Sequence, residues 1–444
     1  MSRRVAAAAA LALALVLPPP AEAAADVQAI ETPGGIEVWL VEASEIPMVA
    51  LELRFGGGAA REPAELAGVT RMMAGLLDEG AGDLDAAAFE AAADGLALRF
   101  GASAGRDAVS VSARMLTGTL DESVELLRLA LTDPRFDADA VERARARQLS
   151  SIRSAETDPG ELASRAWRAA LFPDDPYGRR LSGEAATVAR IDRAALVAAR
   201  ERALDRGDLA VGIVGDVTPD EAAALVDRLL ADLPETERDP LGPAEFAEAR
   251  ELEVVELDAP QAVARLVQEG IGRDDPDFFA AVVMEHVLGG GGFSSRLTQE
   301  VRVERGLTYS VSSFLGRWDR AAVLGAQVAS DNARVAEAIA VIRDEWARMR
   351  ETGVTEEELE DAKRYLTGAW PLAFDSNAKI ASALAGFMSE GLPPDYLETR
   401  NALVEAVTLE DVNRVAARLL APERLQVVVV GRPEGLEETA DAAD

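Results

Sequence analysis

Apolar residues in the first half of the chain either alternate with polar ones or form short runs bounded by turn residues, a pattern that predicts β-strands. The predicted strands of this half are 36–41, 48–55, 96–102, 108–115 and 209–215. Between them, apolar residues recur roughly every three or four positions, which is typical of amphipathic helices. The predicted helices of this half are 63–78, 83–94, 120–131 and 137–154.

The second half repeats this order of elements. Its predicted strands are 252–257, 262–270, 307–315, 321–329 and 425–431, and its predicted helices are 276–288, 294–305, 333–350 and 355–366. Equivalent strands begin at Leu96 and Leu307, which are 211 positions apart. A repeat about half the chain long predicts two similar domains rather than a solenoid of short units.

The remaining segments lack this periodicity. Residues 233–250 are rich in Pro and Glu and are predicted to form a linker. Residues 433–444 are small and acidic, and we expect a frayed tail there. The sequence therefore predicts an α+β fold with two similar domains, 26–232 and 251–432, each a mixed or antiparallel β-sheet with helices packed on one face.

The first 23 residues have the organisation of a secretory signal peptide. Arg3 and Arg4 precede the apolar run 5–17, and Ala21-Glu22-Ala23 is a small-residue cleavage site. The apolar run is too short to span a bilayer as a permanent helix. We expect cleavage near Ala23 and export to a periplasm without a stable membrane anchor, by either the Sec or the Tat route.

Composition narrows the classes of function. The chain carries 45 Lys and Arg against 78 Asp and Glu, a formal net charge of -33, which disfavours binding to nucleic acid and to anionic lipid. It has no cysteine and a single histidine, His286. Disulfides, thiolate nucleophiles and Cys-based metal sites are therefore excluded, as is any site that needs two imidazoles.

Two motifs add a family resemblance. Residues 171–178 read Leu-Phe-Pro-Asp-Asp-Pro-Tyr-Gly, and residues 289–297 read Gly-Gly-Gly-Gly-Phe-Ser-Ser-Arg-Leu. Together with the repeated order of elements, these resemble the pitrilysin/insulinase family of zinc peptidases over essentially the whole mature chain. The chain is similar to the non-zinc subunit of mitochondrial processing peptidase and of bacterial two-subunit relatives. The resemblance implies a half-clamshell that pairs with a second chain.

Peptidases of this family carry an inverted zinc motif, His-x-x-Glu-His, with a distant Glu as third ligand. Arg71 stands where the first His belongs, Ala74 where the Glu belongs and Gly75 where the second His belongs. The third ligand falls at about Ser151. Zinc needs at least three N, S or O donors, and its water needs a general base. We therefore expect no metal and no zinc peptidase activity in this chain alone.

Two residues of the second half match the family's pattern. Arg302 lies in the last turn of the predicted helix 294–305, and Tyr309 follows the break at Gly306. The resemblance implies that this pair binds substrate carbonyls and helps to hold the tetrahedral oxyanion. A guanidinium and a phenol can both donate hydrogen bonds to developing negative charge. The alternative is a surface arginine and a packing tyrosine.

The glycine run just before this pair is a candidate substrate contact. Gly289, Gly290, Gly291 and Gly292 offer exposed backbone, and with Phe293 they are predicted to bind substrate, as the resemblance implies. The alternative is a plain flexible connector. No strand precedes the run and no Gly-Lys-Ser/Thr follows it, so it is not a phosphate loop. His286 is expected to be a partly buried structural histidine.

The leading hypothesis is a substrate-binding, non-zinc subunit of a heterodimeric zinc endopeptidase. Zinc is expected in the paralogous partner, and Arg302 and Tyr309 would act across the chamber on peptide substrates. The alternative is a catalytically inactive peptide-binding or assembly protein, as a homodimer or scaffold. A serine hydrolase is disfavoured, because Ser294 and Ser295 lack the strand–elbow–helix pattern.

Overall fold

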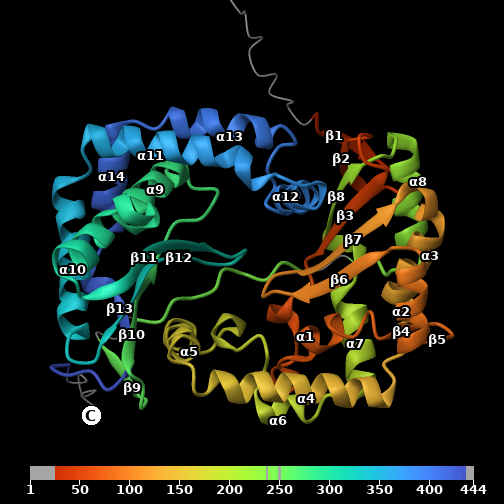
Figure 1. The fold of residues 1–444 in the computed structure, drawn as a ribbon, viewed down its shortest axis with the longest axis horizontal. Helices are drawn as coiled ribbons and strands as arrows, with labels where there is room; N and C mark the ends of the chain where they lie inside the picture. Colours follow the sequence, from red (N-terminus) through yellow and green to blue (C-terminus); the bar gives the residue numbers. More distant parts are fainter. Residues whose placement is uncertain (1–25, 237–238, 249–251, 437–444) are drawn as a thin grey trace, which may run out of the picture.

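The computed structural model describes residues 26–236, 239–248 and 252–436, which form two halves, each built around one β-sheet (Figure 1). The sheet of the first half contains, in spatial order, β1 (Gln28–Glu31), β2 (Glu37–Glu42), β8 (Leu209–Gly215), β3 (Met48–Phe55), β7 (Val109–Leu116) and β6 (Arg99–Ala104). The sheet of the second half contains β11 (Thr308–Arg317), β12 (Ala322–Asp331), β10 (Gln261–Glu269), β13 (Gln426–Gly431) and β9 (Glu253–Glu256). The predicted signal peptide at 1–23 and residues 437–444 of the predicted tail lie outside the described residues.

The two sheets have the same topology. In the first, β2 pairs parallel with β8, and the pairs β8–β3, β3–β7 and β7–β6 are antiparallel. In the second, β9 pairs parallel with β13, and β13–β10, β10–β12 and β12–β11 are antiparallel. Strand β1 has no equivalent in this order and was not predicted. The predicted α+β fold of two similar domains with mixed sheets is therefore confirmed.

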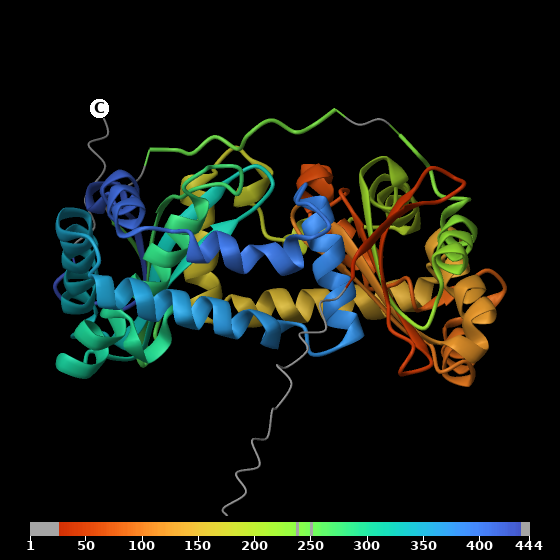
Figure 2. The ribbon, with the colours of Figure 1, turned by 90° about the horizontal axis from the view of Figure 1, so that it is seen from above.

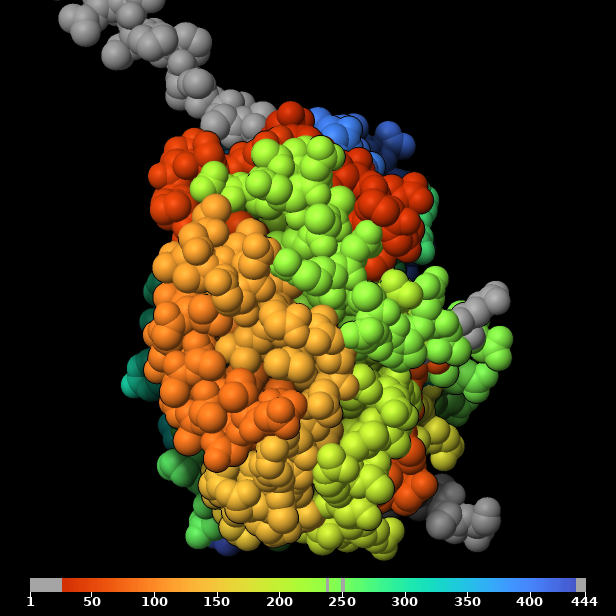
Figure 3. Space-filling view, turned by 90° about the vertical axis from the view of Figure 1, so that its right-hand side faces the viewer, coloured from red at the N-terminus to blue at the C-terminus, as the bar shows by residue number. Residues whose placement is uncertain are grey.

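Each sheet has a hydrophobic core on the face covered by the helices of its own half. Those of the first half are α1 (Val69–Ala74), α2 (Ala86–Gly95), α3 (Leu120–Thr132), α4 (Ala138–Ala155), α6 (Ala185–Val188), α7 (Arg193–Ala203) and α8 (Pro219–Leu230). Those of the second are α9 (Phe278–Glu285), α10 (Val335–Thr352), α11 (Glu356–Ala369), α13 (Tyr396–Glu405) and α14 (Leu409–Leu419). Figure 3 shows the helices of the first half closing its outer surface. No helix among the described residues is long and apolar enough to cross a membrane.

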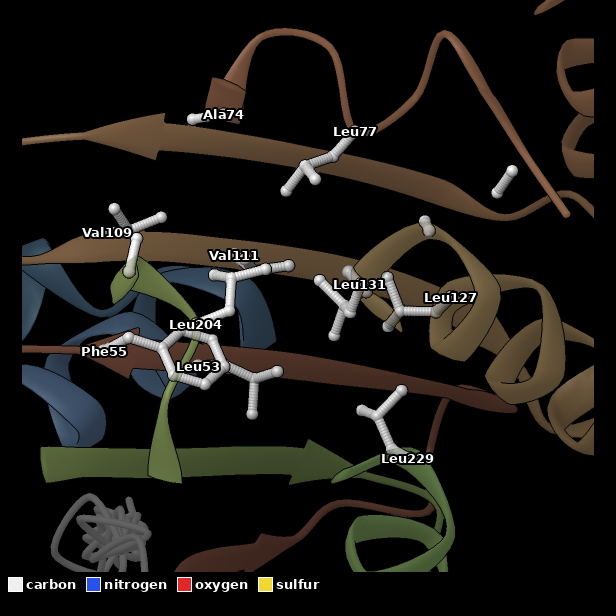
Figure 4. Close-up of a cluster of buried hydrophobic side chains, with 14 of the residues drawn as sticks. Leu53, Phe55, Ala74, Leu77, Val109, Val111, Leu127, Leu131, Leu204 and Leu229 are labelled. Atoms are coloured by element: carbon white, nitrogen blue, oxygen red, sulfur yellow. The ribbon is translucent and has the colours of Figure 1, made fainter. Parts of the chain in front are cut away.

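The core of the first half follows from strand alternation. Leu53 and Phe55 on β3 and Val109 and Val111 on β7 are buried and point to the same side, because alternate residues of a strand share a face (Figure 4). Leucines from the helices, including Leu127 of α3, pack onto them (Figure 4). The alternating apolar residues of these strands thus form the core beneath the helices of the first half.

Two helices cross between the halves. Helix α12 (Asn377–Ser389) follows the second-half helix α11 in the chain but packs on β8 and β3 of the first sheet, where Ala381 and Leu384 contact Trp39 and Val214. Helix α5 (Pro159–Leu171) follows α4 in the chain but packs on β10 and β13 of the second sheet. Figures 1 and 2 show both helices between the two halves. Each sheet is therefore covered on both faces, whereas the sequence predicted helices on one face only.

The predicted helix 63–78 is much shorter in the structure. A 3₁₀ turn covers Ala64–Leu66, and α1 covers only Val69–Ala74. Gly68 separates them with a φ of 95°, and a Cβ there would lie 2.6 Å from the carbonyl oxygen of Ser182. The buried carboxylate of Glu62 accepts hydrogen bonds from the N–H groups of Gly68 and Thr70 and so fixes this start of the helix.

Two predicted helices of the second half are partly π-helical. Helix α9 continues as a π-helical turn over His286–Gly290, and the predicted helix 294–305 is a π-helix over Thr298–Glu304. Such π-helical turns are frequent at functional sites. Gly306 ends the second one with a φ of 58°, and its N–H donates to the carbonyl oxygen of Arg302, as expected for a glycine just past a helix end.

Glu52 makes folding stability depend on pH. It lies on β3, on the same face as Ala50 beneath α12, and burial raises the pKa of its carboxyl to about 7 against the opposing effects of Ser110 and Arg54. Between about pH 4.5 and 7 the folded state therefore binds more protons than the unfolded state, so the free energy of unfolding falls as pH rises.

We expect Glu52→Gln to remove the loss of stability that ionisation of the buried Glu52 carboxyl causes above pH 4.5. At pH 8 the variant should unfold with a free energy about 1–3 kcal/mol higher than the wild type, and at pH 4.5 the two should be alike. Thermal denaturation at both pH values measures the difference. Glu31→Gln, an exposed change on β1, is the control. A stabilisation of equal size at pH 4.5 and pH 8 would show that the effect does not come from ionisation.

Candidate functional site

Two positions aligned with the family's zinc motif lie together in the first half, although they are 80 residues apart in sequence. Arg71 on α1 and Ser151 on α4 line one pocket of about 420 Å³. Ala74 is 3% exposed and belongs to the hydrophobic core (Figure 4), and Gly75 caps the end of α1 by donating its N–H to the carbonyl oxygen of Arg71. Helix α1 ends at Ala74, so the aligned positions do not lie on a long helix of the kind that would carry a metal motif.

These residues do not fit a zinc ion. A guanidinium, two side chains without donor atoms and one hydroxyl replace the three ligands and the base that the metal needs. Among the residues that the structure describes, no group of three or more His, Cys, Asp or Glu side chains could hold a metal ion. The pocket is lined largely by arginines instead, and these were not predicted.

Tyr309 is presented by a β-bulge on an edge strand. Strand β11 is the last strand of its sheet, and its pairing with β12 shifts between Thr308, opposite Ser330, and Ser310, opposite Ala329. Tyr309 is the extra residue, and it is 84% exposed. The Thr308 hydroxyl, which donates to the carbonyl oxygen of Ala329 and accepts from the N–H of Ser310, stabilises the bulge. Bulges commonly re-aim a side chain in this way.

Arg302 lies in the π-helix that packs against β11. Its guanidinium stacks over the ring of Phe293, 4.8 Å from the ring centroid, and Phe293 is itself 69% exposed. Within the described part of the chain, Arg302 forms no ion pair and the Tyr309 hydroxyl makes no hydrogen bond. Both groups are therefore free to donate to a ligand.

The glycine run is tightly packed at its start and open at its end. Gly289 is buried, and a Cβ there would lie 2.4 Å from the backbone nitrogen of Ser313 on β11. Gly290 leaves room for the carboxylate of Glu285, which accepts a hydrogen bond from the Ser313 hydroxyl. Burial raises the pKa of this carboxyl. The exposed backbone expected of the run is thus provided by Gly290 and Gly292, and Gly289 is a packing residue.

His286 has the structural role expected of it. It is 8% exposed, and its ring stacks on Tyr365 of α11 at a centroid distance of 4.8 Å. Burial lowers the pKa of the imidazole. A Cβ on Gly291 would lie 3.0 Å from its Nε2 atom, so the histidine shapes the path of the glycine run.

The motif at 171–178 joins the two halves. Arg320, in the turn between β11 and β12, donates two hydrogen bonds to the carboxylate of Asp175, and its Nε donates to the carbonyl oxygen of Gly242 in the linker. The backbone N–H of Arg320 donates to the Tyr177 hydroxyl, which in turn donates to Asp107. A pocket of about 890 Å³ lies beside this network, between the halves.

In a comparison with known proteins, two models of the same family match this chain. Residues 37–185 match the model described as insulinase (peptidase family M16), and residues 190–366 match the model described as the peptidase M16 inactive domain. The crystal structure of a peptidase M16 inactive domain from Pseudomonas fluorescens has a TM-score of 0.86 and 30% identity, covering 92% of this chain and 98% of that chain.

Relatives in the same comparison differ in their described activity. A non-peptidase homolog, YmxG, of Helicobacter pylori is 24% identical, covering 83% of this chain and 85% of its own length. An uncharacterized zinc protease of Mycobacterium tuberculosis is 29% identical, covering 91% and 92%. A probable mitochondrial-processing peptidase subunit beta of Schizosaccharomyces pombe is 24% identical, covering 85% of both chains. The relatives thus include a non-peptidase, a zinc protease and a peptidase subunit.

Proposed function

The chain belongs to the insulinase family, peptidase family M16, and because its zinc positions hold no ligands we propose that it is the substrate-binding subunit of a heterodimeric zinc endopeptidase. A paralogous partner supplies the zinc and its water-activating base. This chain supplies Arg302 and Tyr309 to the same active site. Export by the segment 1–23 puts the complex in the periplasm.

One observation carries this proposal. A bulge holds Tyr309 outward, and its hydroxyl makes no hydrogen bond with a described residue. The π-helix packed against its strand presents the guanidinium of Arg302, which forms no ion pair with a described residue. Tyr309 is 84% exposed, so its hydroxyl is available to a ligand. Two free donors beside a glycine-bordered surface suit a peptide carbonyl that becomes an oxyanion.

The chemistry of the pair follows from its charges and its hydrogen-bond donors. The carbonyl oxygen of a peptide gains negative charge when water attacks its carbon, so donors fixed at this oxygen bind the transition state more tightly than the substrate. The Arg302 guanidinium provides a permanent positive charge, and the Tyr309 hydroxyl provides a neutral donor. The attacking water and its base belong to the partner.

The alternative is an inactive peptide-binding or assembly protein of the same fold, a role favoured by the similarity to the non-peptidase of Helicobacter pylori. Association separates the two functions. We expect this chain, purified without residues 1–23 and mixed with a paralogue that carries His-x-x-Glu-His, to form a one-to-one complex by size-exclusion chromatography with light scattering. A homodimer that ignores the paralogue would favour the alternative.

A further inference from the structure

A pocket rich in arginine contains two of the positions aligned with the zinc motif, Arg71 and Ser151. We call it the arginine pocket, and its basic side chains come from four different segments of the first half. They are Arg71, Arg106, Arg165, Arg168 and Arg180. The pocket has a volume of about 420 Å³ and also contains the hydroxyls of Ser151, Ser154 and Ser182. Such a concentration of positive charge is unexpected in a chain with a formal net charge of -33.

The carboxylates nearby offset these positive charges only in part. Asp158 and Glu161 line the pocket; the charge of Glu161 acts on Arg168, and Asp158 also caps α5 by accepting the N–H of Glu161. Glu184 lies 3.4 Å from Arg165 and 3.5 Å from Arg180, and it is shared between them. The Arg180 atom in this ion pair, Nη1, is buried and makes no hydrogen bond in addition to it. Arg71, Arg106 and Arg168 form no ion pair with any residue that the structure describes.

Two of these three arginines contact aromatic rings, and the Nε of Arg106 also donates to the carbonyl oxygen of Tyr177. The guanidinium of Arg168 lies 5.3 Å from the ring centroid of Trp167, and that of Arg106 lies 5.5 Å from that of Trp318. The two tryptophan rings stack on each other at 6.0 Å. Burial, followed by the charges of Arg106 and Arg265, lowers the pKa of Arg168 to about 10. Like charges brought together in this way cost free energy that a bound anion recovers.

The surroundings of the pocket indicate what kind of anion enters it. Arg106 follows β6, which is the last strand of its sheet in the described part of the chain, and it lines both the arginine pocket and the 890 Å³ pocket between the halves. Ser103 and Ala104 of β6 line that larger pocket too. An extended peptide paired with this strand edge would therefore reach the guanidinium groups with its side chains.

We infer that the arginine pocket, which contains two of the positions aligned with the zinc motif, binds the carboxylate side chains of acidic peptides. Arginine forks match carboxylates in a bidentate geometry. Because the chain as a whole repels anions, such binding requires a local site and cannot come from overall charge. This inference rests on the proposed function only in taking peptides as ligands, and it needs no partner subunit.

Peptide binding to the isolated chain tests the arginine-pocket inference without measuring peptidase activity. The inference can therefore fail while the proposed split active site stands, and the split site can fail while the inference stands. Quenching of Trp167 and Trp318 fluorescence and calorimetry would follow an eight-residue peptide with three Glu at 150 mM salt. The same peptide with Gln in place of Glu, and inorganic phosphate, are the other two arms. We expect the Glu peptide to bind at least about tenfold more tightly than either.

Arg71→Gln should weaken binding of the Glu peptide by about tenfold, because it removes an exposed guanidinium that forms no ion pair with a described residue. Arg153→Gln removes the same charge from an exposed site on α4 outside the pocket and should leave binding unchanged. Circular dichroism checks that both variants are folded. Equal binding of the Glu and Gln peptides, binding of phosphate as tight as that of the Glu peptide, or equal effects of the two substitutions would each overturn the inference.

Discussion

Replacing Tyr309 with phenylalanine is expected to lower the turnover of the assembled peptidase by about 100-fold, because removal of one oxyanion donor costs roughly that much. The Tyr309 hydroxyl has no partner among the described residues, so its loss leaves no unsatisfied group in the fold. The ring and the bulge that presents it remain. Assembly with the partner and thermal stability should therefore not change, and steady-state kinetics on a quenched peptide measures the effect.

The matched control is Tyr365→Phe. Tyr365 is also an exposed tyrosine, 61% accessible, and its ring stacks on His286 through a face that phenylalanine keeps. We expect its turnover to stay within about twofold of the wild type, since no donor to the oxyanion is lost. Arg302→Ala should reduce turnover at least as much as Tyr309→Phe, because it removes a charged donor. Equal turnover in the wild type and in both site variants would exclude the assignment of the pair.

Arg320→Ala is expected to cause the largest loss of stability among single changes at the junction of the halves. The side chains of Arg320 and Asp175 are 13% and 15% exposed, and the shortest N–O distance between them is 2.5 Å. Breaking a buried pair leaves an uncompensated carboxylate, which costs about 3–5 kcal/mol. The linker carbonyl of Gly242 loses its donor as well. Urea unfolding followed by tryptophan fluorescence measures the change.

Arg364→Ala is the control for this prediction. Arg364 pairs with Asp361 at 2.6 Å, but the two side chains are 74% and 62% exposed. Exposed pairs of this kind contribute about 0–1 kcal/mol. If both substitutions shift the urea midpoint by the same amount, the junction does not depend on the Arg320–Asp175 pair. A much larger shift for Arg320→Ala would show that this ion pair stabilises the junction between the halves.

Strands were predictable because their signal is local. The predicted strands 48–55 and 209–215 coincide with β3 and β8, since alternation and short apolar runs depend only on which residues face a core. The half-length repeat extended this success to the positions of the strands in the second half. The predicted helix 63–78 was wrong in length, because the position of Gly68 against Ser182 is a tertiary contact that helical periodicity does not reveal.

The exchange of helices between the halves was not predictable from one chain read in order. Helices α5 and α12 have ordinary amphipathic sequences, and nothing local states which sheet each one covers. The candidate site was likewise predictable only in part. The resemblance singled out Arg302 and Tyr309, but the bulge that exposes Tyr309 arises from its pairing with β12. Arg165 and Arg168 carried a weak signal, their spacing on one face of a helix, and only the fold brings them to Arg71.

The most direct test of the central claim is peptidase activity with zinc analysis on this chain, purified alone and mixed with a paralogue that carries His-x-x-Glu-His. The expected result is no activity and no zinc in this chain alone. The mixture should be active, with about one zinc per complex that follows the partner. Chelator-sensitive peptidase activity from this chain alone would contradict the split site, because none of its described residues form a metal-binding group.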